Sequence, residues 1–508
     1  MASPSSGLLD SDNLAQVELE LDTDLADYEK WQPTAAVGKQ KQIINWIASW
    51  IRPRPRSRSK PLHPTAYLDG LRGFAALLVY FHHHELWVHK LGNPHKSNVL
   101  ESGVLESGFG YDGRFHMVAF PGVRTFFSGG HYAVSTFFVL SGYVLSIKSL
   151  DLIEKGDLTA LGDHLASAFF RRWVRLFLPV AATVVVYATS WHLFGIWVDG
   201  HSAKNNWLDE MWSLYTEFKN FSFLYDTGGE PWLSYNFHVW SIPVEMKGSL
   251  VVFASLLAFS RCTVNARLYC QLALIVYFLY IADGWYCAMF SAGMLLSHLD
   301  LLAKLERLPG FLARLKPYKT IIYHHLLAIS VFLGGVPGQG GGAEQLARNY
   351  AWYYLSYLKP QAVFDYKWFY LFWAAVLLVA SVAHVSWLRR FLETRVCQYL
   401  GRISYALYLV HGPVLWSVGD RLYMAVGWKR PEQMKHIPHW ADRFPLPSAG
   451  PYGLEVSFLL PHLILLPLTL GLADFVTGFI DRPSVTFAGW LYRKTLPKEP
   501  SKCIKNEQ

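Results

Sequence analysis

Charged residues are scarce in this chain of 508 residues. Asp, Glu, Lys and Arg together make up 17% of it, whereas hydrophobic residues make up 52%. Soluble domains contain roughly 25% charged residues, so this composition argues against an ordinary soluble protein. The 20 Trp and 28 Tyr residues instead suit a protein with aromatic belts at two membrane interfaces.

Cysteine is also scarce, and its spacing is irregular. The chain has five cysteines and no C-x-x-C pair, so we expect neither a disulfide framework nor a zinc site. We also expect no bound cofactor and no metal ion. No apolar run follows the N-terminus, which argues against a cleaved signal peptide.

The two ends of the chain differ in charge from the middle. Residues 1–40 are acidic and poor in apolar side chains, which predicts a disordered cytosolic tail. Residues 41–66 combine an amphipathic helix with a basic juxtamembrane run, an arrangement typical of a cytosolic anchor. The membrane domain is predicted to cover residues 67–480, and residues 481–508 to form a basic cytosolic tail.

Long apolar runs fill the middle of the chain, and a membrane-spanning helix needs roughly 20 such residues. The sequence therefore predicts an all-α, polytopic integral membrane protein with about ten spans. They are residues 67–88, 125–147, 174–196, 238–260, 264–282, 284–301, 320–336, 367–388, 398–418 and 453–479. The basic residues alternate between these runs rather than forming one patch, which argues against nucleic-acid binding. Their placement puts both termini in the cytosol, and without other targeting signals we expect the endoplasmic reticulum.

The first predicted span contains groups that are costly in hydrocarbon, which marks it as a functional site. Arg72 lies near its start and His83 near its end, 11 residues later. At ~100° per residue this is three turns plus about 20°, so the two side chains share one face. The neighbours His82 and His84 point elsewhere, although sequence alone leaves open which of the three histidines acts.

Other spans carry polar groups at similar depth. At ~1.5 Å per residue, His83, Glu245 and His411 fall between the middle of the membrane and its outer third. A histidine–carboxylate cluster is one interpretation, and a structural Arg partner for Glu245 is the other. Likewise, Ser141 could be a small-residue helix contact, and Asp69 a helix cap.

Five motifs, in order, resemble those of the acyltransferase-3 family of integral membrane acyltransferases. The family's Arg, ten residues, His pattern falls on Arg72 and His83. The other motifs are FFVLSGY from residue 137, RRWVRLFLP from 171, WSIPVE from 240 and GRISYALYLVH from 401. The basic N-terminal arm and the long outside loops are more similar to those of fungal members, which often modify natural products.

The resemblance implies a membrane-bound O-acyltransferase. It would move an acyl group from acyl-CoA, with acetyl-CoA among the candidates, to a hydroxyl of a small molecule such as a secondary metabolite. His83 would be the general base, with Glu245 and His411 as further catalytic groups. The residues expected to bind cofactor or substrate are Arg72, Asp69, Arg172, Arg175, Trp240, Ser141 and Tyr405. A transporter with an intramembrane His/Glu relay is the alternative class, and a non-catalytic scaffold is a third.

Overall fold

A computed structural model describes residues 62–89, 120, 122–225, 232–338, 343–348, 351–450 and 454–497. Chain contacts divide the protein into two units, residues 1–67 and 68–508. The structure describes the first unit only from residue 62 onward, so the predicted tail 1–40 lies outside the described residues. The amphipathic and basic segment before residue 62, and the chain end after residue 497, also lie outside them.

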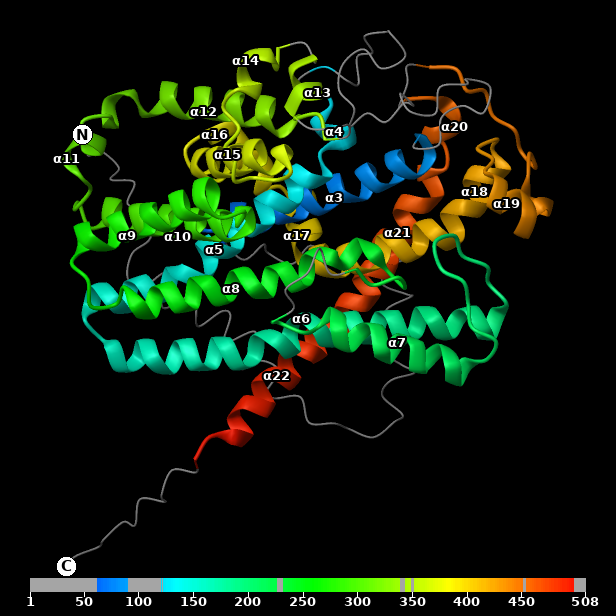
Figure 1. Cartoon of the computed structure of the whole chain (residues 1–508), viewed down its shortest axis with the longest axis horizontal. Helices are drawn as coiled ribbons and strands as arrows, with labels where there is room; N and C mark the ends of the chain where they lie inside the picture. Colours follow the sequence, from blue (N-terminus) through cyan, green and yellow to red (C-terminus); the bar gives the residue numbers. More distant parts are fainter. Residues whose placement is uncertain are drawn as a thin grey trace, which may run out of the picture. The chain divides into compact units, whose positions relative to one another are not determined.

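Every regular element in the described ranges is helical (Figure 1). The α-helices are α3 (Ala66–His89), α4 (Thr125–Ser128), α5 (Gly130–Lys155), α6 (Leu158–Phe194), α7 (Trp207–Phe221), α8 (Ser241–Ala258), α9 (Val264–Val276), α10 (Trp285–Lys304), α11 (Gly310–Ala313), α12 (Lys319–Gly334), α13 (Ala343–Arg348), α14 (Tyr353–Ser356), α15 (Tyr366–Val382), α16 (Ser386–Leu392), α17 (Arg395–Val414), α18 (Asp420–Ala425), α19 (Pro431–His436), α20 (Val456–Leu459), α21 (His462–Val476) and α22 (Arg482–Thr495). Short 3₁₀ or π segments extend several of them, including η4 (Phe237–Trp240), η5 (Tyr277–Ile281), η7 (Leu415–Gly419) and η9 (Thr477–Asp481). The all-α prediction is confirmed.

The ten predicted spans fall on helices, but 125–147, 367–388 and 453–479 each cover two α-helices, and residue 453 lies outside the described residues. Within the described residues, six helices are long and apolar enough to cross a membrane. A seventh is counted if α15 and α16, which meet at 92°, form one broken span. The chain is therefore a multi-pass membrane protein, and the total of ten spans stays a prediction.

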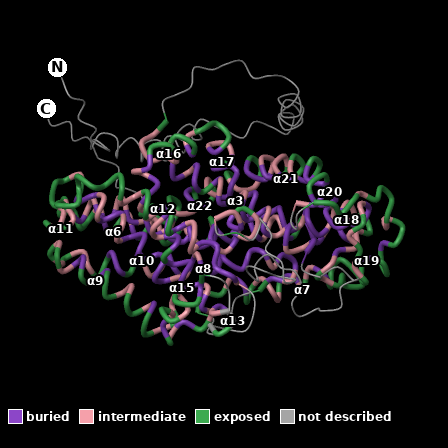
Figure 2. Tube along the Cα trace, turned by 90° about the horizontal axis from the view of Figure 1, so that it is seen from above, coloured by how far each residue is buried: buried purple, intermediate pink, exposed green. Residues whose placement is uncertain are grey.

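The helices pack through close contacts among α5, α8, α10 and α15, while α17 packs against α21. Two glycines explain how near α5 and α10 lie: a Cβ on Gly142 would fall 2.1 Å from the Phe290 carbonyl oxygen, and one on Gly293 would fall 2.1 Å from that of Val139. Small residues permit such approach in membrane helices. Figure 2 shows the resulting pattern, with mainly buried positions on these helices, few buried ones on α9 and none on α11.

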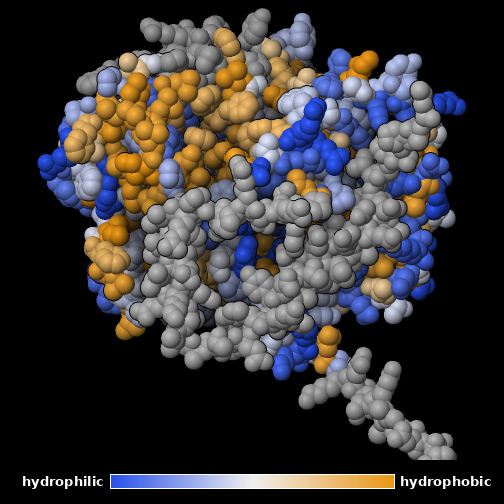
Figure 3. Space-filling model, turned by 180° about the vertical axis from the view of Figure 1, so that it is seen from behind, coloured by the Kyte–Doolittle hydropathy of each residue, from blue (hydrophilic) through white to orange (hydrophobic). Residues whose placement is uncertain are grey.

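Exposed apolar side chains mark surfaces suited to lipid. On α21, Leu463, Ile464 and Leu468 are 72%, 56% and 43% exposed. Figure 3 shows a broad hydrophobic field on one side of the face it draws and mostly hydrophilic atoms on the other. Exposed apolar surface of this extent is unusual in a soluble monomer and is expected where lipid tails are the solvent.

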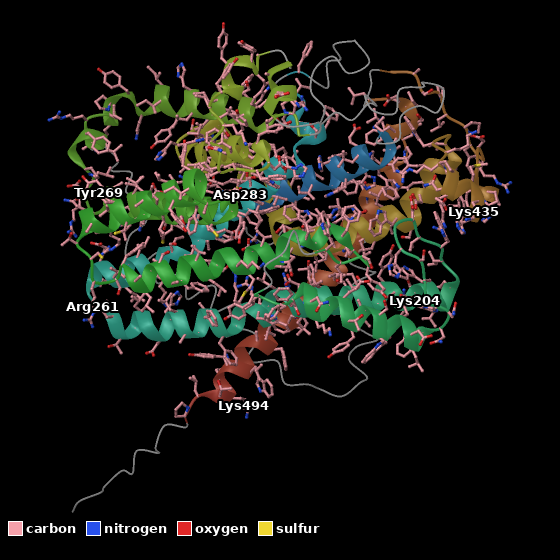
Figure 4. All side chains as sticks on the ribbon, viewed as in Figure 1. Lys204, Arg261, Tyr269, Asp283, Lys435 and Lys494 are labelled. Atoms are coloured by element: carbon pink, nitrogen blue, oxygen red, sulfur yellow. The ribbon has the colours of Figure 1, made fainter. Side chains whose placement is uncertain are left out.

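Charged residues in the connecting loops lie at both ends of the helices. Arg261, after α8, lies at the end where α5 turns into α6, and Lys204 and Lys435 lie together at the opposite end (Figure 4). Which end faces the cytosol stays a prediction.

The contact that positions the site is between α3 and α17. A Cβ on Gly73 would fall 2.2 Å from the Gly401 amide nitrogen, and one on Gly401 would fall 2.4 Å from the Asp69 carbonyl oxygen. The two backbones can approach this closely only because both residues lack side chains. The helices run parallel, since Arg72 contacts Gly401 and Ser404 while His83, further along α3, contacts His411.

Gly401→Ala is expected to destabilise the protein by about 1–3 kcal/mol, the usual cost of overpacking a tight contact. The measurement is the free energy of unfolding in mild detergent. Gly162→Ala in α6 is the matched control, since a Cβ there meets nothing within 4 Å. The control should be neutral or stabilising by up to about 1 kcal/mol. Equal effects of the two substitutions would contradict the proposed role of the glycine contact.

Candidate functional site

Arg72 is fixed at the cytosolic end predicted for α3. Its Nε donates to Ser404 Oγ at 3.0 Å and its NH2 to the Gly401 carbonyl at 3.2 Å. Asp69, one turn earlier, forms an ion pair with it at 3.4 Å. The side chain of Arg72 nevertheless remains 47% exposed, so part of the guanidinium is available to another anion.

His83 and His411 meet three turns further along the same pair of helices. His411 Nε2 lies 3.1 Å from His83 Nδ1, which also lies 2.9 Å from the Val79 carbonyl oxygen. A carbonyl can only accept, so His83 Nδ1 must carry the proton and His83 Nε2 the lone pair. His411 Nδ1 faces the Leu407 carbonyl at 3.2 Å, which likewise leaves its Nε2 as an acceptor. The predicted shared face of Arg72 and His83 is confirmed, since both contact α17.

A third imidazole, that of His238 in η4, completes the cluster. Its ring centroid lies 4.3 Å from that of His83 and 5.0 Å from that of His411. Its Nδ1 lies 3.3 Å from Asn236 Oδ1, while Asn236 Nδ2 donates to the Leu409 carbonyl at 3.0 Å. The Asn236 amide is therefore oriented by α17, and it leaves His238 Nε2 as a lone pair.

Close packing holds His238 against α17. A Cβ on Gly412 would fall 2.2 Å from His238 Nδ1, so only glycine leaves room for the ring. The Tyr408 hydroxyl hydrogen-bonds to the His238 carbonyl and lies 2.7 Å from Ser241 Oγ. These contacts tie the start of α8 to α17 at the histidine cluster.

The segment before His238 is anchored by two carboxylates of α7. Tyr235 donates its hydroxyl proton to Glu210 at 2.6 Å, and Ser234 donates to Glu217 at 2.8 Å. Burial alone would raise the pKa of Glu210, but hydrogen bonds from Tyr235, the Lys204 amide and two histidines outweigh it and lower that pKa. Glu210 is thus an ionised anchor for the loop that carries Asn236 and His238.

A cavity of about 20 Å³ adjoins the cluster. It is lined by His82, His83, Gly130, His131, Val134, Trp240 and Tyr408. This volume suffices for one water molecule, so larger molecules require the helices around it to separate. Trp240 closes one side, packed edge-on against Trp368 at 5.9 Å between ring centroids.

Glu245 does not join the histidines through any contact in the described residues. Its carboxylate forms an ion pair with Arg172 at 2.5 Å and accepts a hydrogen bond from Ser141. Arg172 also donates to Ser249 at 3.0 Å. Of the two interpretations of Glu245 from sequence, the geometry is that of an Arg partner. Ser141 donates its hydrogen bond to Glu245 of this ion pair, while its neighbour Gly142 makes the close contact with α10.

Three arginines and three acids lie at the end of the site that is predicted to face the cytosol. Arg175 interacts electrostatically with Arg72, Arg172 and the acid Asp481. Tyr405 lies among them and donates to the Leu176 carbonyl at 2.5 Å. We call Arg72, Arg172 and Arg175 the basic cluster; each has an acidic neighbour, and the half-exposed Arg72 is open to an anionic ligand.

The three adjacent histidines of α3 have different surroundings. His84 Nδ1 lies 2.7 Å from the Tyr423 hydroxyl, in a separate group with His462. The His82 ring packs edge-on against His131 at 5.2 Å. Of these three, His83 is the histidine whose Nδ1 lies 3.1 Å from His411 Nε2.

His238 and Asn236 were not singled out as site residues from sequence. His238 begins the predicted span 238–260, two residues before the WSIPVE motif, a signal that could have suggested it, whereas nothing in the sequence marks Asn236. The prediction of no metal rested on the cysteines. In the structure, ligand atoms of His83, His238 and His411 lie within 4.8 Å of one another, so this trio could hold a transition-metal ion.

Fold and site together define a multi-pass membrane protein with a buried histidine cluster between helices and a basic cluster on one side of it. The acyltransferase-3 family model, described as an acyltransferase domain, matches residues 65–477. This protein belongs to the acyltransferase-3 family.

Three relatives agree with this assignment. The O-acetyltransferase PaAT-1 of Phomopsis amygdali is 28% identical over 482 residues, covering 87% of each chain. The acyltransferase clz18 of Cochliobolus lunatus is 25% identical over 496 residues, covering 87% of this chain and 98% of its own. A third, an acyltransferase of a Phoma species, is 22% identical and covers 73% of this chain and 86% of its own. No solved structure matches the chain.

Arg172→Met is expected to destabilise the protein by about 3–5 kcal/mol, because it leaves the Glu245 carboxylate without its partner. The double variant Arg172→Met/Glu245→Leu should recover most of that loss. The free energies of unfolding of Arg172→Met, Glu245→Leu and the double variant in detergent give the coupling energy between the two side chains. Additive losses would show that the two side chains do not depend on each other.

Proposed function

We propose that this protein is a membrane-bound O-acyltransferase that transfers an acyl group from acyl-CoA to a hydroxyl of a small-molecule acceptor. Family membership supports acyl transfer, and the name of the relative PaAT-1 supports an oxygen acceptor and an acetyl donor. The observation that carries the proposal is the His83–His411 pair, which leaves a free imidazole lone pair beside a cavity inside a membrane protein.

His83 acts as the general base through Nε2. It takes the proton of the acceptor hydroxyl as that oxygen attacks the thioester carbonyl and forms the ester bond. The carbon–sulfur bond then breaks, and the leaving CoA thiolate takes the proton from His83, so the base is regenerated. General-base help of this kind is worth ~10²–10⁴-fold in rate.

His411 and His238 support the base. The imidazolium formed on His83 keeps its Nδ1 proton directed at His411 Nε2, 3.1 Å away, which stabilises the charge and fixes the ring. His238 Nε2 adds a second neutral acceptor near the acceptor hydroxyl. Glu245, which sequence placed among the catalytic groups, acts here by fixing Arg172.

The basic cluster receives the phosphates of acyl-CoA. Arg72 lies 11 residues before His83, or about 16 Å along the helix at 1.5 Å per residue. A guanidinium binds phosphate oxygens through paired hydrogen bonds, and the extended pantetheine arm of CoA suits a separation of this order. Asp69, Ser141 and Tyr405 orient or surround the arginines, and Trp240 faces the acceptor.

The acceptor is best sought among hydrophobic secondary metabolites of fungi, since the relatives come from such organisms. We place the protein in the endoplasmic reticulum, with both termini in the cytosol, so that the basic cluster faces the cytosolic acyl-CoA pool. Comparing the metabolites of cells with and without the gene would identify the product by a mass difference of one acyl group.

His83→Gln should lower the rate of acyl transfer by ~10²–10⁴-fold, since glutamine keeps polarity but cannot take the proton. The rate is measured as acyl-CoA-dependent product in microsomes, normalised to folded protein. His84→Gln is the matched control, because this neighbouring buried histidine belongs to the Tyr423 group. Full turnover by His83→Gln, or an equal loss of rate in both variants, would contradict the assignment of His83 as the general base.

Arg72→Gln should raise KM for acyl-CoA about 10- to 100-fold, the effect of losing one hydrogen bond to a charged group. The maximal rate should fall less. Arg402→Gln is the control, because Arg402 lies in the corresponding half of the neighbouring helix α17 and pairs with Asp474 at 3.0 Å. An unchanged KM in Arg72→Gln would remove Arg72 from the cofactor site.

A further inference from the structure

We propose that His83, His238 and His411 form a binding site for one divalent transition-metal ion, and that its occupancy blocks acyl transfer. The binding part goes beyond the proposed function. The blocking part rests on that function, because it assumes that His83 is the base.

The donor set points to this class of metal. It consists of three imidazoles from three separate segments, with ligand atoms within 4.8 Å of one another. Imidazole suits zinc, copper, nickel and cobalt, whereas magnesium and calcium require oxygen ligands. Three histidines with one open position is a common arrangement for zinc.

The spacing of His83 and His411 fits a shared metal ion as well as a hydrogen bond. Their Nδ1 and Nε2 atoms are 3.1 Å apart. Two nitrogen ligands at about 2.05 Å from a tetrahedral zinc ion are about 3.3 Å apart. The ion therefore fits the spacing of this pair, but the His83 Nδ1 proton must first leave the Val79 carbonyl oxygen. The His238 ring must also move closer to supply the third nitrogen, since the ligand atoms are spread over as much as 4.8 Å.

The surroundings resemble those of metal-binding histidines, which usually direct their second nitrogen at a carbonyl or carboxylate oxygen. His411 directs Nδ1 at the Leu407 carbonyl, and His238 directs its Nδ1 at Asn236. Both Nε2 atoms are therefore lone pairs held in place. The adjoining cavity of about 20 Å³, lined by His83 and Tyr408, has room for the water that would be the fourth ligand.

Metal binding and base catalysis compete for His83. To bind through Nδ1, the ring must move its proton from Nδ1 to Nε2. Nε2 then bears hydrogen and can no longer take a proton from the acceptor hydroxyl. A metal ion would thus inhibit the reaction without contacting the basic cluster.

Calorimetric titration of the purified full-length protein with ZnCl₂ tests the binding. One Zn²⁺ should bind per chain, and His238→Gln and His411→Gln should each weaken binding about 10-fold or more. His84→Gln, the matched buried control, should bind as the unsubstituted protein does. The absence of saturable binding, or equal binding by His238→Gln, would overturn the site.

Acyl transfer assays test the blocking. Protein treated with a chelator should be fully active, added Zn²⁺ should inhibit it, and further chelator should restore it. Loss of activity on chelation with rescue by Zn²⁺ would overturn the blocking role. Zinc binding is read without substrate, so a protein that binds zinc but transfers no acyl group would contradict the proposed function alone.

Discussion

The close contact between α3 and α17 is the constraint on which the site depends. Gly73 and Gly401 allow the two backbones to meet, and the helices then run parallel for three turns. That register brings Arg72 to Ser404 at one end and His83 to His411 at the other. A side chain at either glycine would separate the helices and break both contacts together.

Charge in the membrane domain is arranged in pairs around this contact. Glu245 is held by Arg172, which limits the cost of burying that pair. Arg72 is held by Asp69, where both side chains remain partly exposed. The histidines are not held by ion pairs; carbonyl and amide oxygens accept from them and fix their tautomers. Neutral imidazoles cost less in a membrane than charges do, and they keep lone pairs for chemistry.

Much of the fold could be predicted from the sequence, because apolar runs of sufficient length have few alternatives to helices in a membrane. The shared face of Arg72 and His83 also followed from helical periodicity alone. The partner of Glu245 did not, since depth along a helix says nothing of which neighbour it faces. The same limit hid Asn236, whose role depends on a hydrogen bond to a helix 173 positions away.

His238 shows where such reasoning stops. It lies at the start of a span and 155 residues from His83 in sequence, and only the packing of η4 on α17 brings the two rings together. Gly412 enables that packing, yet a single glycine in an apolar run does not predict that an imidazole ring lies beside it.

A cryo-EM map of the protein with a non-hydrolysable thioether analogue of acyl-CoA would test the central claim most directly. The account predicts that the diphosphate lies against Arg72 and Arg175 and that the carbon replacing the thioester carbonyl lies beside His83 Nε2. An analogue bound with its acyl end away from the histidine cluster would contradict it.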